Sequence, residues 1–122
     1  MAKVLGLGGF FFKTEDPKAV RDWYARVLGF KVHDWGGVIF EQPKASQATW
    51  SPFAADTQYF APSSAPFMIN FVVEDIDGLL AKAADEGVEP IGRQDEDMGR
   101  FAWLIDPAGV KIELWEPGKA EV

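Results

Sequence analysis

Side chains that could bind a metal ion or act as a nucleophile are scarce in this sequence. The 122 residues include no cysteine and one histidine, His33. The lack of cysteine excludes disulfides, iron–sulfur clusters, thiolate zinc sites and thiol nucleophiles. A single imidazole excludes any site that needs two histidines from one chain. The chemistry open to the chain is therefore mainly that of carboxylates, amides and aromatic rings, of which the chain has 5 Trp, 2 Tyr and 10 Phe.

Three local patterns invite a functional interpretation, but none has the required context. The glycines at 6, 8 and 9 lie within a predicted strand and do not open a helix directly, so a phosphate-binding loop is not expected. The acidic run at 95–97 lacks the spacing of a calcium loop, which favours a solvated loop. His33 lies beside Asp34 and a Gly-Gly turn, where a surface histidine is the simpler interpretation.

Net charge and hydropathy exclude some of the partners that the chain could bind. The formal net charge is −7, and no cluster of Lys and Arg offsets it, so neither nucleic acid nor an anionic membrane surface is expected as a partner. The apolar run at 4–12 is too short to span a membrane, and no cleavage site for a signal peptide follows it. A single cytoplasmic domain with an ordinary hydrophobic core is the expectation.

The elements that must position any site follow from hydrophobic spacing. In the first half, Asp16 and Pro17 indicate a helix start, and apolar residues at helical spacing continue to Gly29. Alternating or apolar runs predict strands at Leu5–Phe12, Phe30–His33 and Val38–Glu41, with a possible further strand at Ala48–Phe53.

The second half repeats this order. Asp75 opens a helix that ends at Gly87, and an acidic loop is expected at Arg93–Met98. Asp106–Gly109 reads as a turn. The predicted strands are Phe67–Val73, Val88–Ile91, Phe101–Ile105 and Val110–Trp115.

Matching landmarks in the two halves predict a tandem duplication. Both helices begin at an aspartate and end at a glycine, and a Trp-x-Pro sequence closes each half. The expected fold is α+β, with two βαβββ modules that form one curled, cup-like mixed sheet. The single domain, 1–122, would comprise module 1 at about 3–53, a connector at 54–66 and module 2 at about 67–117.

Two segments carry a family resemblance. Residues 14–30, with Asp16-Pro17, Trp23-Tyr24 and Leu28-Gly29-Phe30, resemble the N-terminal signature of the vicinal oxygen chelate superfamily. Residues 106–117, with Asp106-Pro107 and Glu113-Leu114, resemble its C-terminal signature. This superfamily includes glyoxalase I, extradiol dioxygenases, and fosfomycin- and bleomycin-resistance proteins. The resemblance implies a cavity enclosed by the two modules, and in the enzymes a divalent metal at its base.

The metal ligands that this resemblance implies are mostly missing. Carried over by spacing from Asp16 and Asp75, the four positions are Gly9, Ala48 or Thr49, Met68 and Glu113. Glycine and alanine offer no side-chain donor, and a thioether suits neither Mg, Mn nor Zn. No metal or other cofactor is therefore expected.

Strand alternation then predicts which side chains line the cavity. They are Phe11, Trp50, Met68, Asn70, Glu113 and Trp115; the face occupied by Trp103 stays open. Phe11, Trp50 and Met68 could equally be core residues. Asn70 and Glu113 indicate a pocket, because buried polar groups need partners. Glu113 could instead be paired with Lys13 or Arg100 as a relic of a metal site.

The favoured hypothesis is a metal-independent protein that binds a small aromatic, neutral or cationic molecule without turnover. The alternative is a glyoxalase-like lyase or isomerase, such as a lactoylglutathione lyase, or a dioxygenase-type enzyme. It would use Glu113 as a general base or with a metal completed by a partner chain. A structural or regulatory subunit is a third possibility. The resemblance also implies a homodimer.

Overall fold

The computed structural model of the chain describes residues 2–5, 7–42 and 47–118. Two helices and four strands are formed in the order α1, β1, α2, β2, β3 and β4. Helix α1 is Pro17–Leu28 and α2 is Ile76–Asp85. The strands are β1 at Ile69–Val72, β2 at Gly92–Glu96, β3 at Gly99–Ile105 and β4 at Lys111–Pro117. No helix in the described ranges is long and apolar enough to cross a membrane.

Both helices begin where their capping residues predict. The Asp16 carboxylate accepts from the Ala19 backbone N–H, and Asp75 accepts from Gly78 in the same way. Such caps satisfy backbone donors that the first helical turn leaves free. Gly29 ends α1 in the left-handed conformation, with φ of 73°, which a residue with a Cβ adopts at a cost.

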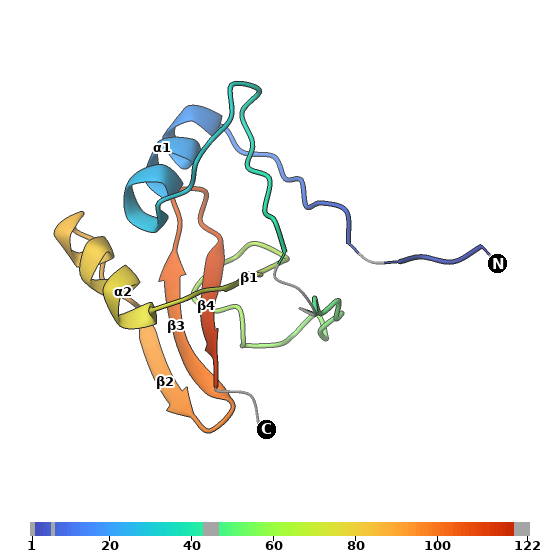
Figure 1. The fold of residues 1–122 in the computed structure, drawn as a ribbon. Helices are drawn as coiled ribbons and strands as arrows, with labels where there is room; N and C mark the ends of the chain where they lie inside the picture. Colours follow the sequence, from blue (N-terminus) through green and yellow to red (C-terminus); the bar gives the residue numbers. More distant parts are fainter. Residues whose placement is uncertain (1, 6, 43–46, 119–122) are drawn as a thin grey trace.

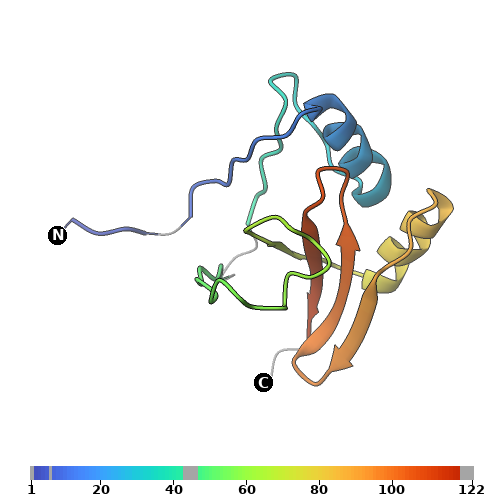
Figure 2. The same ribbon diagram turned by 180° about the vertical axis from the view of Figure 1, so that it is seen from behind.

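The four strands form one mixed sheet in the order β1-β4-β3-β2. β1 pairs in parallel with β4, whereas β2–β3 and β3–β4 are antiparallel. Helix α2 lies between β1 and β2 in the chain. Figures 1 and 2 show both helices on one side of the sheet and the connector, 54–66, on the other.

The core lies between the helices and the covered face of the sheet. Alternate residues of β3 and β4 point into it, and Ala102, Leu104, Ile112 and Leu114 are fully buried. The helices contribute apolar residues at helical spacing: Val20, Trp23, Tyr24 and Val27 from α1, and Ile76 and Ala83 from α2. The opposite face of the sheet is left for other contacts.

The two motifs of the family resemblance meet in this core. Tyr24 Oη donates to Asp106 Oδ2 at 2.5 Å, and Asp106 Oδ1 accepts from the backbone N–H groups of Ala108 and Val110. Asp106 is 3% exposed and fixes the β3–β4 turn. Burial, followed by the hydrogen bond to Asp106, raises the pKa of Tyr24 well above its ordinary range. Both motifs therefore have a structural role.

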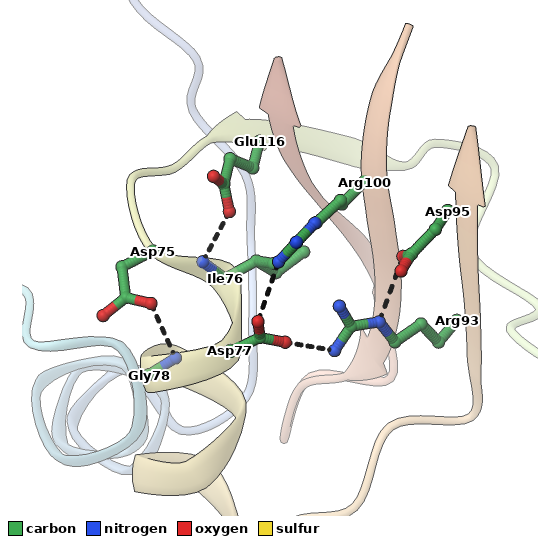
Figure 3. Close-up of polar contacts among 8 residues, drawn as sticks. All are labelled: Asp75, Ile76, Asp77, Gly78, Arg93, Asp95, Arg100 and Glu116. Carbon is green, nitrogen blue, oxygen red and sulfur yellow. Dashed lines mark hydrogen bonds and ion pairs between the residues drawn. The ribbon is translucent and has the colours of Figure 1, made fainter. Parts of the chain in front are cut away.

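A second polar cluster holds the start of α2 against the sheet (Figure 3). Asp77 pairs with Arg93 and Arg100, each at 2.7 Å, and Arg93 also pairs with Asp95. The hydrogen bond from Arg93 is the main cause of the lowered pKa of Asp77. The Glu116 carboxylate accepts from the Ile76 backbone N–H at 2.9 Å. Residues from α2, β2, β3 and β4 are thus joined outside the core.

Strand predictions succeed in the second half, with two corrections. Val88–Ile91 is not a strand, although the Ile91 N–H bonds to the Trp103 carbonyl. Strand β2 instead occupies Gly92–Glu96 and so covers most of Arg93–Met98, the stretch predicted to be an acidic loop. Charged residues suit this edge strand because solvent reaches one of its sides and α2 supplies Asp77 as a partner for Arg93.

The strands predicted for the first half do not form within the described residues. All four predicted stretches are outside helices and strands: Leu5–Phe12, Phe30–His33, Val38–Glu41 and Ala48–Phe53. Residue 6 of the first stretch lies outside the described part of the chain. An alternating pattern supplies an apolar face but no hydrogen-bonding partner, and an unpaired strand is not stable. The N-terminal arm, the described residues of 2–12, extends away from the body of the chain toward its N-terminus (Figures 1 and 2) and leaves Val4, Leu5 and Phe11 about nine-tenths exposed. At its other end, the rings of Phe10 and Phe12 lie 5.3 and 6.2 Å from that of Phe67.

Candidate functional site

The candidate site lies on the face of the sheet opposite the helices, which we call the open face. The strand register places four pairs of side chains on it: Asn70 and Val72 of β1, Glu113 and Trp115 of β4, Phe101 and Trp103 of β3, and Gln94 and Glu96 of β2. Large aromatic rings and a few polar groups make this face different from the apolar face beneath the helices.

Glu113 is the centre of the polar contacts on the open face. Its Oε1 accepts from Asn70 Nδ2 at 2.6 Å, and its Oε2 accepts from Trp103 Nε1 at 2.8 Å and from the Tyr59 hydroxyl. Glu113 is 8% exposed. None of the ion pairs among the described residues includes it. The carboxylate is therefore stabilised by three uncharged donors rather than by a cation.

Tyr59 reaches Glu113 from the connector, which crosses the open face in Figure 2. Two further contacts attach this segment to the sheet and its turn: Lys111 Nζ donates to the Tyr59 carbonyl at 2.7 Å, and the Ser63 hydroxyl donates to the Gly109 carbonyl. Burial, followed by the hydrogen bond to Glu113, raises the pKa of Tyr59 to about 12. Tyr59 is still 41% exposed, so solvent reaches part of its ring.

Three aromatic rings stand in a row across β3 and β4. Phe101 lies between Trp103 and Trp115, with ring centroids 6.3 and 6.2 Å apart and interplanar angles of 12° and 5°. Phe101, Trp103, Tyr59, Gln94 and Glu96 line a pocket of about 320 Å³. Such a combination of aromatic walls and a few polar groups is typical of small-molecule sites.

Gly99 allows Trp115 to reach its position at the end of this row. A Cβ at residue 99 would lie 2.7 Å from Trp115 Nε1 and 2.5 Å from the Glu116 carbonyl oxygen, and Gly99 has φ of 145°. Both observations require glycine there. In the described part of the chain, the buried Trp115 N–H has no hydrogen-bond partner. The Trp115 ring is therefore positioned by packing rather than by a hydrogen bond of its own.

The structure brings together three of the six residues predicted to line the cavity. Asn70 and Glu113 are hydrogen-bonded neighbours, and Trp115 shares their face as strand alternation predicts. Met68 precedes β1 and is half-buried. Phe11 and Trp50 are not part of this group and are 89% and 78% exposed. Neither forms the wall or the core that their pattern indicated, because their predicted strands have no partner here.

Sequence reasoning missed several residues of the site. Trp103, whose face was left open, points to Glu113, and alternation with Phe101 could have placed it once β3 was aligned with β4. The sequence predicts a loop where β2 forms, so it does not place Gln94 and Glu96 on this face. No local signal marks Tyr59, since its role depends on how the connector folds back. Arg100, offered as a partner of Glu113, pairs with Asp77 instead.

The donor set at Glu113 does not fit the divalent metal of the superfamily's enzymes. Glu113 is the only one of the predicted ligand positions with a suitable side chain, and three hydrogen bonds already engage its two oxygens. Within the residues that the structure describes, no three His, Cys, Asp or Glu side chains lie close enough to hold a metal.

Comparison with known sequences identifies the family. A family model described as a glyoxalase-like domain matches residues 9–115. The chain belongs to this family, and hence to the vicinal oxygen chelate superfamily. The match extends across both halves, including the N-terminal half, whose described residues form no strand. No curated protein sequence matched the chain.

Two solved structures with TM-scores above 0.5 support the same fold. A protein from the mobile metagenome of V. Pseudocholerae shares 16% identity over 99% of both chains, with a TM-score of 0.60. TnmS3, an antibiotic binding protein from Streptomyces sp. CB03234, shares 22% identity over 86% of this chain and 89% of its own, with a TM-score of 0.54. A glyoxalase/bleomycin resistance protein from Catenulispora Acidiphila DSM 44928 shares 24% identity over 84% and 90%, with a TM-score of 0.48.

Proposed function

We propose that this protein binds a planar aromatic molecule, neutral or cationic, on the open face of its sheet, without a metal and without turnover. The observation that carries the proposal is the pocket between Tyr59 of the connector and the rings of Phe101 and Trp103. Flat apolar walls bind planar rings by stacking and exclude water from them. The one charged residue of the lining, Glu96, is acidic, which favours a neutral or cationic ligand over an anion.

The antibiotic-binding description of TnmS3 agrees with this proposal, although at 22% identity it supports only the fold. The alternative, an enzyme that uses Glu113 as a base, has less support. Proton abstraction by Glu113 needs a metal or an oxyanion stabiliser beside it. Of the four predicted metal positions, only Glu113 itself has a suitable side chain.

Titration of tryptophan fluorescence with a panel of planar aromatic compounds tests the proposed binding. We expect quenching in the wild type and an affinity at least about tenfold lower in Trp103→Ala, which removes one wall of the pocket. Trp35→Phe is the matched control, since Trp35 is exposed and stacks on His33 away from the pocket. Equal loss in both variants, or no quenching by any compound, would contradict the proposal.

Metal independence is tested separately. The proposal predicts unchanged affinity for the ligand after dialysis against a chelator, and no stoichiometric metal in protein purified without a tag. The basis is the donor set, in which Gly9, Ala48 or Thr49, and Met68 stand where the superfamily's enzymes have ligands. A metal ion bound at one per chain that is required for ligand binding would overturn this part of the proposal.

We also propose that the protein acts as a homodimer in the cytoplasm. The N-terminal arm exposes large apolar side chains, and one edge of β1 has no strand beside it among the described residues. A hollow of about 360 Å³ next to that edge is lined by Phe30, Phe40, Phe71 and Val72, among others. Sedimentation velocity should give a dimer mass, and deletion of residues 2–12 should shift it toward the monomer. A monomer at all concentrations would contradict the assembly.

A further inference from the structure

We propose that the ligand presents a phenol-type hydroxyl to Glu113, in the place that the connector's Tyr59 occupies in the free protein. This inference rests on the proposed function and specifies the chemistry of the ligand. The protein's own phenol is seated against the buried carboxylate: its hydroxyl donates to Glu113, and its ring forms a wall of the pocket. The geometry thus shows which chemical group this site accommodates.

Tyr59 is the exchangeable one of the three donors to Glu113. Asn70 and Trp103 donate from β1 and β3, whose backbones are fixed in the sheet on either side of β4. Tyr59 donates from a connector outside any helix or strand, and it is 41% exposed. Its removal requires movement of the connector but no change in the sheet. A ligand can therefore take its place while the other two donors remain.

The surroundings of the Tyr59 ring suit a neutral hydroxyl-bearing aromatic molecule. Lys111 Nζ lies 5.2 Å from the centre of the Tyr59 ring and 5.6 Å from that of the Trp103 ring, within range of cation–π attraction. Phe53 stacks against Tyr59 with centroids 5.8 Å apart and planes 9° apart. An aromatic ring that replaces Tyr59 would meet the same ammonium group and the Trp103 ring, both of which belong to the sheet.

The burial of Glu113 should make the site distinguish ligands that have a hydroxyl donor from ligands that lack one. If a ligand without a donor displaced Tyr59, the 8%-exposed carboxylate would lose one of its three hydrogen bonds without replacement. Sites built to hydrogen-bond a hydroxyl reject analogues that lack it far more strongly than apolar walls discriminate by shape. Glu113 would therefore select ligands by their donor, and the aromatic row would bind their rings.

A matched pair of probes tests this selection. 2-Naphthol carries the hydroxyl donor, whereas 2-methoxynaphthalene has nearly the same shape and no donor. Calorimetric titration should show wild type binding 2-naphthol at least about tenfold more tightly, as expected for a hydrogen bond to a charged group. Glu113→Gln should reduce this ratio toward one, and circular dichroism would confirm that the variant is folded.

Variants of the connector test whether Tyr59 occupies the place of the ligand. Tyr59→Phe keeps the ring but frees the carboxylate, so it should bind 2-naphthol about threefold to fivefold more tightly than the wild type. Gln58→Ala is the control, because the exposed side chain of the neighbouring Gln58 donates to the Asp56 carbonyl within the connector. It should bind both probes as the wild type does.

The outcomes separate this inference from the proposed function. Equal affinity of the wild type for both probes, or unchanged 2-naphthol affinity in Tyr59→Phe, would overturn the phenol inference and leave aromatic binding intact. Failure of both probes and of the whole aromatic panel to bind any variant would overturn both. Hydrogen exchange gives an independent readout: 2-naphthol should accelerate exchange in residues 53–60 of the wild type, and unchanged or slower exchange would contradict displacement.

Discussion

The two tyrosines of the chain make the same bond in two different environments. Tyr24 donates to Asp106 between the helices and the sheet, and Tyr59 donates to Glu113 on the open face. Both carboxylates are buried and each accepts three hydrogen bonds. The difference lies in the segments that carry the donors. At Asp106 they are a helix and a turn packed in the core, whereas at Glu113 they are two strands and, for Tyr59, a half-exposed connector segment.

This difference separates a structural site from one that can exchange partners. The donors to Asp106 can leave only if α1 or the β3–β4 turn unfolds, since both are packed in the core. Tyr59 can leave Glu113 while the sheet remains intact. The same chemical contact therefore stabilises the fold in one region and covers the proposed binding site in the other.

The largest effect on stability should come from Asp106→Ala. This substitution leaves the Tyr24 hydroxyl and the N–H groups of Ala108 and Val110 without their acceptor in the core. We expect the free energy of unfolding to fall by about 3–5 kcal/mol, measured by urea denaturation. A loss below about 1 kcal/mol would show that the two carboxylates do not differ as described.

Glu113→Gln should cost less. The substitution keeps the shape of the side chain but replaces one acceptor oxygen with an NH₂ group. Since the groups around Glu113 are donors, this NH₂ group cannot accept from them, and at least one hydrogen bond is lost. We expect the free energy of unfolding to fall by about 1–2 kcal/mol. A loss as large as that of Asp106→Ala would place Glu113 among the determinants of the fold instead.

The two Tyr→Phe variants compare the donors directly. Tyr24→Phe should lower the free energy of unfolding by about 1–2 kcal/mol, because its hydroxyl and its acceptor are both buried. Tyr59→Phe should lower it by less than about 1 kcal/mol, because solvent can replace a donor at the half-exposed connector. Equal losses in the two variants, measured by thermal and urea unfolding, would contradict the distinction.

An alkaline titration tests both hydrogen-bonded pairs, Tyr24 with Asp106 and Tyr59 with Glu113. At neutral pH neither tyrosine is expected to ionise. Tyrosinate absorbance at 295 nm should stay absent at pH 10 in the folded protein, because the pKa of Tyr59 is raised to about 12 and that of Tyr24 is raised further. The folded state thus keeps protons that the unfolded chain releases above pH 10. Stability from Tyr59 is complete below pH 10 and is lost as pH rises through 12. Ionisation of either residue at pH 10 would contradict its hydrogen bond.

The features that the sequence predicts correctly are those set by residues close together in the chain. Asp16, Gly29 and Asp75 mark helix ends because caps act within a few residues, and the Asp106–Gly109 turn is equally local. The adjacency of Asn70 and Glu113 follows from strand alternation combined with the family resemblance. Their interpretation as ligand-binding residues stays a prediction.

Long-range contacts explain what the sequence could not predict. Phe11 and Trp50 have the alternation of strand residues, but pairing depends on a partner edge that no local pattern specifies. β2 was missed because its charged residues find partners across the chain, as Arg93 does with Asp77. The contact of Tyr59 with Glu113 joins residues 54 positions apart and has no sequence signature.

The attachment of the connector to the sheet has a consequence for the kinetics of association. Ser63, Tyr59 and Lys111 hold this segment over the open face through three contacts with Gly109, Glu113 and the Tyr59 carbonyl. A ligand that needs the place of Tyr59 must wait for these contacts to open, so its observed association rate should level off at high ligand concentration. The plateau equals the opening rate of the connector, a property of the protein that does not depend on which ligand is used.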